Sequence, residues 1–251
     1  MPELLRFENI EKMFKQHKVL NSLDLTINKG DLIGLIGKSG EGKTTLLRIL
    51  IGFYKIDGGN IFFNSNNVTS KTNLIRDVVG FCTQENSFYP ELTIKENMYY
   101  YGRLYGIKRK ELKKRVEHLL NLVDLSTFQK KLAGDISGGM KRRLDFAISL
   151  VHDPEILILD EPTTGLDPII RKNLWNLIEK ISKEGKTIIV SSHLLDFIEE
   201  KCNKIAVLSK GKVYVFKMSE LKKKFPKEKN LNHMFPKIIN SNLGSIQKRK
   251  R

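Results

Sequence analysis

The chain has 251 residues, of which 40% are hydrophobic, and its 44 Lys and Arg outnumber 28 Asp and Glu, a formal net charge of +16. This length suffices for a sizeable buried core. No stretch approaches the about 20 consecutive apolar residues that cross a bilayer, and the N-terminus lacks a signal-peptide layout. We therefore expect a cytoplasmic protein.

The two cysteines lack metal-ligand spacing, so Cys82 is expected in a strand and Cys202 at a helix end, without a disulfide.

The first part of the chain is predicted to form an antiparallel β lobe. Residues 4–10, 23–27 and 60–64 alternate in polarity or lie next to turn residues, which is typical of half-buried strands. Phe14 lies in a polar segment of this lobe. Taken alone, it is compatible with an ordinary core or surface aromatic.

A glycine-rich loop, GKSGEGKT, follows the apolar run of residues 32–36 and precedes a helical apolar stretch, residues 45–51. Glycines let backbone N–H groups approach a phosphate chain, Lys43 supplies a cation, and the Thr44 hydroxyl suits Mg²⁺. A helix that starts near Lys43 would direct its positive end at the same anion. The predicted nucleotide-binding residues here are Gly37, Lys38, Ser39, Gly40, Glu41, Gly42, Lys43, Thr44 and Thr45.

Between residues 92 and 151 the pattern becomes helical, which predicts a helical subdomain. Residues 111–123 form an amphipathic stretch whose apolar side chains share one face. These side chains are Leu112, Val116, Leu119, Leu120 and Val123.

A short apolar strand, residues 156–159, leads directly into Asp160 and Glu161. Ligands of open α/β sheets bind at the carboxyl ends of strands. Two carboxylates at an apolar strand end are costly unless a cation or hydrogen-bond donors meet them, so Asp160 is predicted to hold Mg²⁺. Glu161 is then available as the general base that deprotonates the attacking water.

Further apolar strands, at residues 78–83, 187–192 and 205–209, alternate with helical stretches. Together with residues 32–36 and 156–160 they predict a mainly parallel sheet flanked by helices, and thus an α/β fold. From residue 217 to the end the chain carries eleven basic and two acidic residues, so residues 218–251 are expected to form a flexible basic tail. The tail is compatible with a solvated segment, with contact to an anionic membrane surface, or, least favoured, with nucleic-acid binding.

Three further motifs complete an ordered set. ISGGM at residues 136–140 opens a helical stretch, Gly165, Leu166 and Asp167 follow the acidic strand, and two serines and His193 end the next strand. The order and spacing resemble the nucleotide-binding domain of ATP-binding cassette (ABC) proteins over residues 4–217. The resemblance implies a P-loop NTPase core (the class named for this phosphate-binding loop), with a mainly parallel sheet, an antiparallel β lobe and an inserted α-helical subdomain at about residues 92–151.

The resemblance also implies roles for individual residues. Ser137, Gly138 and Gly139 would be the signature motif that meets the γ-phosphate of ATP held by a second subunit, and Asp167 would lie at that interface. His193 would contact the γ-phosphate, Gln84 would sense Mg²⁺ and the attacking water, and Phe14 would stack on adenine. Three positions depart from the family pattern: Ile136 replaces leucine, Met140 replaces glutamine and Phe14 replaces tyrosine. None of the three removes a phosphate or metal ligand.

The SGG segment makes physical sense as a second anion site, because a hydroxyl and a positive helix end stand there without a phosphate of their own. One chain thus offers two half-sites, and a homodimer or heterodimer of ATPase domains would complete both.

The resemblance implies the ATPase subunit of a membrane transporter at the inner face of the cell membrane, with separate membrane-spanning permease subunits. The Phe88–Tyr89–Pro90 cluster lies where the family docks on its membrane partner, and residues 140–168 look most like multidrug and antibiotic exporters. Two alternatives stay open. One is a non-transport ABC ATPase that acts on nucleic acid or the ribosome, and the other is a small-molecule kinase built on the same phosphate loop.

Overall fold

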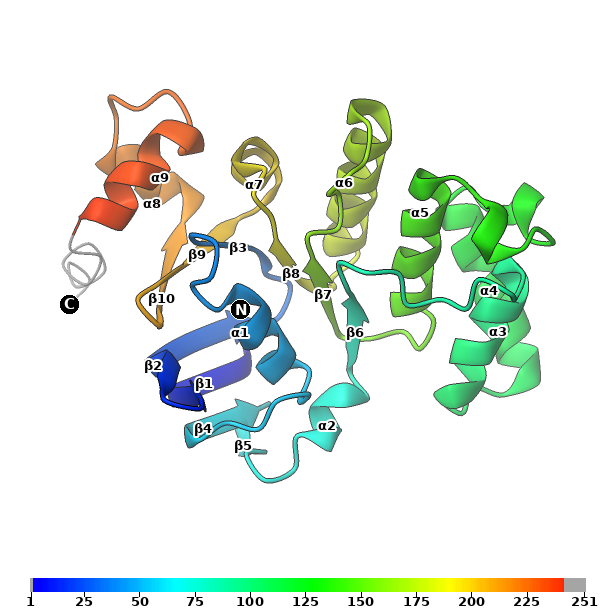
Figure 1. The fold of residues 1–251 in the computed structure, drawn as a ribbon, viewed down its shortest axis with the longest axis horizontal. Coiled ribbons are helices and arrows are strands. Elements are labelled where there is room, and N and C mark those ends of the chain that lie inside the picture. Colours follow the sequence, from blue (N-terminus) through cyan, green and yellow to red (C-terminus); the bar gives the residue numbers. More distant parts are fainter. Residues whose placement is uncertain (1, 242–251) are drawn as a thin grey trace. The chain divides into compact units, whose positions relative to one another are not determined.

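The computed structural model describes residues 2–241, apart from the side chain of Asn73. The chain divides into two compact units. Unit 1 comprises the residues up to Arg76 and from Thr187 onward, and unit 2 comprises Asp77–Lys186. Figure 1 shows the antiparallel strands of unit 1 in blue and cyan, and the helical part of unit 2 in green.

Unit 1 contains the predicted antiparallel lobe. Its strands run in the order β2-β1-β4-β5. Alternate side chains of β1 and β2 are buried, as the period of a strand with one core face requires. The bounds are β1 (Glu3–Phe14), β2 (His17–Asn28), β4 (Gly58–Phe63) and β5 (Asn66–Asn67). The strands β1 and β2 are longer than the sequence predicted, because they continue into a tight hairpin in which Phe14 pairs with His17.

The second sheet portion of unit 1 runs β10-β9-β3-β8. The strands β9, β3 and β8 are parallel, and β10 adds an antiparallel edge. Every residue of β3 and β8 is buried, which explains the apolar sequence of β3 and of residues 188–190 in β8. The bounds are β3 (Leu32–Ile36), β8 (Thr187–Ser191), β9 (Lys204–Ser209) and β10 (Lys212–Lys217). The helices of unit 1 are α1 (Lys43–Leu50), α2 (Asn73–Arg76), α7 (Leu195–Lys201), α8 (Met218–Lys224) and α9 (Leu231–Asn240).

The helices α8 and α9 correct the prediction of a flexible tail for residues 218–241. The side chains of Leu231, Met234 and Ile238 are almost fully buried and recur at helical spacing, so they form an apolar stripe. The carboxylate of Glu199 in α7 accepts a hydrogen bond from the backbone N–H of Leu231 at 2.6 Å. The prediction of a flexible tail was based on the many lysines of this segment, and net charge does not reveal apolar residues at helical spacing. Residues 242–251 lie outside the described part of the chain.

Unit 2 pairs β6 (Val79–Cys82) in parallel with β7 (Ile156–Asp160). Its helices are α3 (Ile94–Leu104), α4 (Arg109–Leu122), α5 (Gly138–Ser149) and α6 (Pro168–Lys183), and 3-10 turns span Ser126–Phe128 and Ala133–Asp135. All five predicted apolar side chains of residues 111–123 are buried. Both cysteines are buried and unpaired, Cys82 in β6 and Cys202 at the end of α7, as predicted.

Gly80 in β6 lets the end of α5 pack directly on the strand. A Cβ at this position would collide with the backbone carbonyl of Ser149 and approach Pro154 at 2.9 Å. We expect Gly80→Ala to destabilise the protein by about 2 kcal/mol or more, because overpacking forces backbone to move. In urea denaturation, Gly58→Ala in β4 is the matched control, since its Cβ would meet only Glu11 side-chain atoms at ordinary distances. Equal stability of the two variants would contradict this account of the packing.

Candidate functional site

The glycine-rich loop of unit 1 connects β3 to α1, and the side chain of Lys43 supports its backbone. The Nζ atom of Lys43 donates hydrogen bonds to the carbonyl oxygens of Gly37 at 2.8 Å and Lys38 at 3.1 Å. Gly42 precedes α1 with φ 101°, a left-handed conformation that favours glycine. The loop therefore curves around the Lys43 ammonium, as a phosphate cradle requires.

Neighbouring strands support this loop. A Cβ on Gly37 would lie 2.6 Å from the carbonyl oxygen of Leu208, and one on Gly42 would lie 2.6 Å from the Val19 side chain. The Glu41 carboxylate accepts a hydrogen bond from the backbone N–H of Lys210 at 2.6 Å. Glu41, predicted as a nucleotide contact, thus also anchors the loop to the β9–β10 turn.

The parallel pairing of β3 and β8 places His193 at the same sheet edge as the loop. Leu35 pairs with Ser191, so both strands end together, with the loop after Ile36 and His193 two residues after Ser191. The His193 side chain is exposed at this edge, and Ser191 and Ser192 behind it are buried.

Phe14 ends β1 with 37% of its surface exposed. Its ring stands edge-on to Tyr54, with centroids 5.2 Å apart, and the Lys12 ammonium lies 5.3 Å from its centroid. The hairpin partner β2 contributes Val19, the residue next to Gly42. An accessible aromatic face therefore stands on the hairpin that supports the phosphate loop.

Unit 2 places the two carboxylates at the end of β7. Asp160 is 6% exposed, and Glu161 adopts φ 49°, which turns the chain sharply after the strand. The Thr164 hydroxyl donates to the Glu161 carboxylate at 3.2 Å. Because Cys82 pairs with Leu159, the exposed Gln84 after β6 belongs to the same strand edge as these carboxylates.

Arg142, which the sequence analysis did not single out, connects these strand ends to α5. The residue is only 6% exposed. It donates to the carbonyl oxygens of Asp160 and Glu161, both at 3.1 Å, and of Pro162 at 2.6 Å, and also to that of Thr83. From the second turn of α5, this arginine therefore fixes the backbone around the candidate catalytic carboxylates. The sequence around Arg142 contains no pattern that predicts contacts with the carbonyl oxygens of two distant strand ends.

Asp145, three residues further along α5, holds the segment that follows Gln84. Its carboxylate accepts from the backbone N–H and the hydroxyl of Ser87, each at 2.8 Å. Burial raises the pKa of Asp145, and the two bonds from Ser87 counteract this shift. Burial likewise raises the pKa of the nearby Cys82 to about 12, so that thiol stays protonated.

The helix α3 completes the support of this segment. Asn97 is fully buried, accepts from the backbone N–H of Tyr89 at 2.8 Å and donates to its carbonyl oxygen at 2.9 Å. The Tyr101 hydroxyl donates to the Ser87 carbonyl oxygen. Tyr89 remains 44% exposed, whereas Phe88 is 8% exposed. The predicted surface cluster thus consists of Tyr89 and Pro90, and Phe88 packs inside.

The SGG segment opens α5. The Ser137 hydroxyl oxygen accepts from the backbone N–H of Met140 at 3.4 Å, and both Ser137 and Gly138 are exposed. Gly139 is buried against Ile170 of α6, which packs so closely that a Cβ at this position would lie 2.5 Å from its side chain. Asp167 caps α6 and accepts from the backbone N–H groups of Ile169 and Ile170 at 3.0 Å. The exposed Ser137 hydroxyl and the start of α5 therefore lie at the surface of unit 2.

The structure thus gathers the predicted residues within each unit. Unit 1 joins Phe14, the phosphate loop and His193. Unit 2 joins the Gln84 segment, Asp160 and Glu161 to the SGG helix through Arg142 and Asp145. A combined role for residues of both units is part of the proposal below.

The chain matches the family model described as "ABC transporter" over residues 20–164. It is 37% identical to the Nod factor export ATP-binding protein I of Burkholderia lata, over 82% of this chain and 68% of the relative. It is 33% identical to the linearmycin resistance ATP-binding protein LnrL of Bacillus subtilis, over 84% of this chain and 68% of the relative.

Solved structures agree with this family. A cassette from Clostridium perfringens that is part of an ABC transporter complex has a TM-score of 0.81 at 25% identity, over 98% of each chain. A dimeric post-hydrolysis state of an ATP-binding cassette, bound to ADP and Pi, has a TM-score of 0.77 at 25% identity, over 86% of this chain and 99% of that one.

The chain therefore belongs to the ABC transporter family, and the predicted α/β fold is confirmed. It is an ATP-binding and ATP-hydrolysing subunit of such a transporter. Within the described residues, no helix is both long and apolar enough to traverse a membrane.

We expect Arg142→Gln to destabilise the protein by about 3 kcal/mol or more and to lower ATP hydrolysis, because buried carbonyl oxygens lose charged donors. Arg143→Gln is the matched control. Its guanidinium donates to one carbonyl oxygen, that of Val123 at 3.0 Å, and its ion pair with the exposed Asp124 spans 3.7 Å, so we expect a loss below about 1 kcal/mol. Denaturant titration and phosphate release measure the two effects. Similar losses in the two variants would refute the special role of Arg142.

Proposed function

We propose that this subunit works as a dimer, with itself or with a close relative, in which ATP is bound between the phosphate loop of one subunit and the SGG segment of the other. Each half of this site is exposed in the structure. The phosphate loop supplies an internally held ammonium, and Ser137 and Gly138 of unit 2 supply an exposed hydroxyl and an exposed helix start. The dimeric cassette with ADP and Pi is similar to this chain in fold.

In this proposal, the phosphates lie over the loop from Gly37 to Thr45 and the adenine stacks on Phe14. Lys43 exchanges its bonds to loop carbonyls for bonds to the β- and γ-phosphates, and this exchange requires little rearrangement of the side chain. His193 contacts the γ-phosphate from the end of β8. The exposed face of Phe14 leaves room for the base.

The oxygen donors fit Mg²⁺. Thr44 contributes a hydroxyl in the first turn of α1, Asp160 a nearly buried carboxylate and Gln84 an amide oxygen, and hard oxygens of this kind are the ligands that Mg²⁺ prefers. When bound, the ion neutralises charge on the phosphates.

Glu161 is proposed to orient and deprotonate the attacking water. The turn at φ 49° directs the chain away from the strand, and the hydroxyl of Thr164 holds one carboxylate oxygen. Gln84 is proposed to sense both this water and the ion. Arg142 keeps the Glu161 backbone in place, so the base is positioned before the substrate arrives.

The helix α5 would couple dimer closure to this chemistry. Its first turn presents Ser137 to the neighbouring subunit, its next turn carries Arg142 behind the carboxylates, and Asp145 holds the Gln84 segment. Movement of the SGG segment would therefore reach the general base and the Gln84 segment through one rigid helix.

We further propose that the subunit drives export through separate membrane-spanning permease subunits at the inner face of the cell membrane. The relatives of Burkholderia lata and Bacillus subtilis carry export and resistance names. The exposed ring of Tyr89, hydrogen-bonded through its hydroxyl to that of Tyr100 at 3.2 Å, offers a fixed aromatic contact for a permease. No observation favours the nucleic-acid, ribosome or kinase alternatives.

We expect Glu161→Gln to keep ATP binding and dimer closure and to slow hydrolysis by about a hundredfold or more, because the amide cannot accept the proton of water. Glu155→Gln, at an exposed position just before β7, is the matched control.

Lys43→Ala should instead weaken nucleotide binding itself. Fluorescent-nucleotide binding, size-exclusion chromatography with ATP, and phosphate release separate these outcomes. Normal hydrolysis in Glu161→Gln would remove the proposed base.

Mixing separately mutated subunits tests the shared site. With Lys43→Ala in one subunit and Ser137→Ala in the other, one composite site carries both changes and the other carries neither. We expect the mixture to recover part of the ATP hydrolysis that either variant lacks alone. If activity does not return although mixed dimers form, the two sites are not independent composites of this kind.

A further inference from the structure

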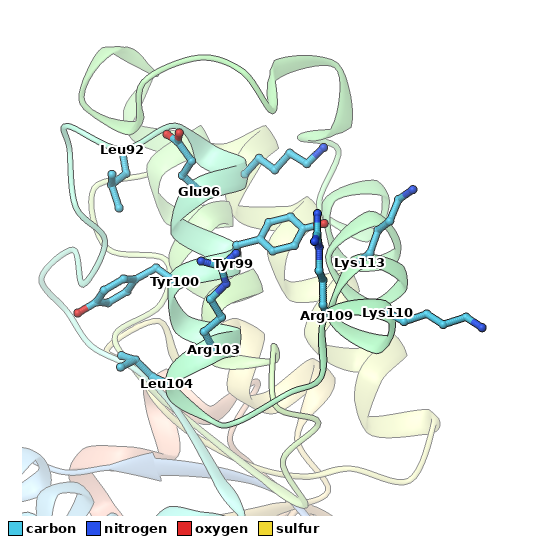
Figure 2. Close-up of a pocket in the computed structure, with 10 residues that line it drawn as sticks. Leu92, Glu96, Tyr99, Tyr100, Arg103, Leu104, Arg109, Lys110 and Lys113 are labelled. Atoms are coloured by element: carbon cyan, nitrogen blue, oxygen red, sulfur yellow. The ribbon is translucent and has the colours of Figure 1, made fainter.

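The groove between α3 and α4 in unit 2 has a cavity volume of about 1040 Å³, and cations and tyrosines line it. Figure 2 shows Tyr99 and Tyr100 of α3 among these side chains, with Lys110 and Lys113 extending from α4. The hydroxyl of Tyr100 bonds to that of Tyr89, which is part of the proposed permease contact. The groove therefore belongs to the surface already proposed for the permease.

In unit 1, the half-buried Tyr54 stands beside the ring of Phe14. The two ring planes meet at 73°, with centroids 5.2 Å apart, so that the edge of one ring lies against the face of the other. Phe14 is at the end of β1 and is partly exposed. An exposed ring without such a neighbour exchanges among several rotamers. The contact with Tyr54 therefore restricts the orientation of the Phe14 ring.

The turn that follows α1 determines where the Tyr54 ring stands. Gly52 adopts φ 68°, a left-handed conformation that favours glycine after a helix end. The backbone N–H of Tyr54 donates to the carbonyl oxygen of Arg48 at 3.2 Å. The Arg48 guanidinium donates to the Tyr54 hydroxyl at 3.0 Å and lies 5.7 Å from the ring centroid. One arginine in the last turn of α1 thus holds both the backbone and the side chain of Tyr54.

The same turn continues to Asp57, which holds the hairpin backbone next to Phe14. Its carboxylate accepts from the backbone N–H of Met13 at 2.6 Å and from the ammonium of Lys12 at 3.0 Å. These bonds, that from Met13 first, hold the pKa of Asp57 below its usual value, so the carboxylate is charged at neutral pH. Asp57 therefore fixes the backbone beside Phe14, and Tyr54 limits the motion of its ring.

We propose that Tyr54 is a positioning residue for ATP binding: it holds the Phe14 ring in the orientation on which adenine stacks, a role that rests on the stacking proposed above for Phe14. A ring that is already oriented loses less freedom when the base binds, so binding is tighter. Because α1 begins at the phosphate loop and carries Arg48 in its last turn, one helix relates the phosphate cradle to the base-stacking ring. The nucleotide thus meets a site whose two ends are already held by the same element.

Equilibrium binding of ATP and of inorganic triphosphate to the full chain tests this role. We expect Tyr54→Ala to weaken ATP binding about fivefold, roughly the contribution of an aromatic pair, and to leave triphosphate binding unchanged. Triphosphate has no base, so a variant that only distorted the phosphate loop would weaken both ligands and would contradict the proposal. Tyr54→Phe keeps the ring and loses an exposed hydrogen bond, so its ATP affinity should stay within about twofold of the wild type.

A double-mutant cycle shows whether Tyr54 acts through Phe14. Once Phe14→Ala has removed the stacking ring, adding Tyr54→Ala should not weaken ATP binding further. Additive losses would overturn the proposal. If Phe14→Ala itself left ATP affinity unchanged, the stacking role of Phe14 would be wrong. If Phe14→Ala weakened ATP binding and Tyr54→Ala did not, only the positioning role of Tyr54 would fail.

Phe53→Ala is the matched control. Phe53 belongs to the same turn, is 65% exposed, and has ring contacts with Tyr54 and Arg48. Its replacement takes away an aromatic side chain but leaves the pair of Tyr54 and Phe14 in place, so we expect an ATP affinity close to that of the wild type. Unchanged triphosphate binding in each variant shows that the phosphate loop is intact. Equal losses of ATP affinity in Phe53→Ala and Tyr54→Ala would overturn the proposal.

Discussion

The guanidinium of Arg142 is the interaction on which the arrangement of unit 2 depends. It is nearly buried and meets carbonyl oxygens at the ends of both β6 and β7. A buried charge without partners is strongly unfavourable, so this one specifies where both strand ends must lie. Because Arg142 belongs to the helix that Ser137 begins, the position of the SGG segment and that of the two carboxylates are determined together.

Asp145 adds a second connection from the same helix. Its carboxylate accepts from the backbone N–H of Ser87, Tyr101 of α3 donates to the carbonyl oxygen of the same residue, and Asn97 of α3 holds the backbone of Tyr89. Gln84 therefore lies on a segment that three helical side chains restrain, although the residue itself is exposed. An accessible side chain on a restrained backbone is what the proposed role of Gln84 requires.

The positively charged side chains lie in different structural settings in the two units. In unit 1 the lysines of residues 218–241 surround two helices with a buried apolar stripe, so much of this charge decorates folded structure. In unit 2 the cations of α3 and α4 line a groove together with exposed tyrosine and leucine. Net charge alone does not distinguish these cases, because it contains no information about which side chains share a surface.

The sequence by itself determined the phosphate loop, the strand that ends in Asp160 and Glu161, the SGG helix start and the α/β class. Each of these depends on residues within a few positions of one another, so local spacing reveals it. Only the tertiary structure decided the roles of Arg142 and Asp145, the burial of Phe88, the folding of residues 218–241 and the α3–α4 groove. Those features arise from contacts between segments far apart in the chain, such as Arg142 with Thr83 or Leu231 with Glu199. No local pattern specifies which distant carbonyl or carboxylate a side chain will meet.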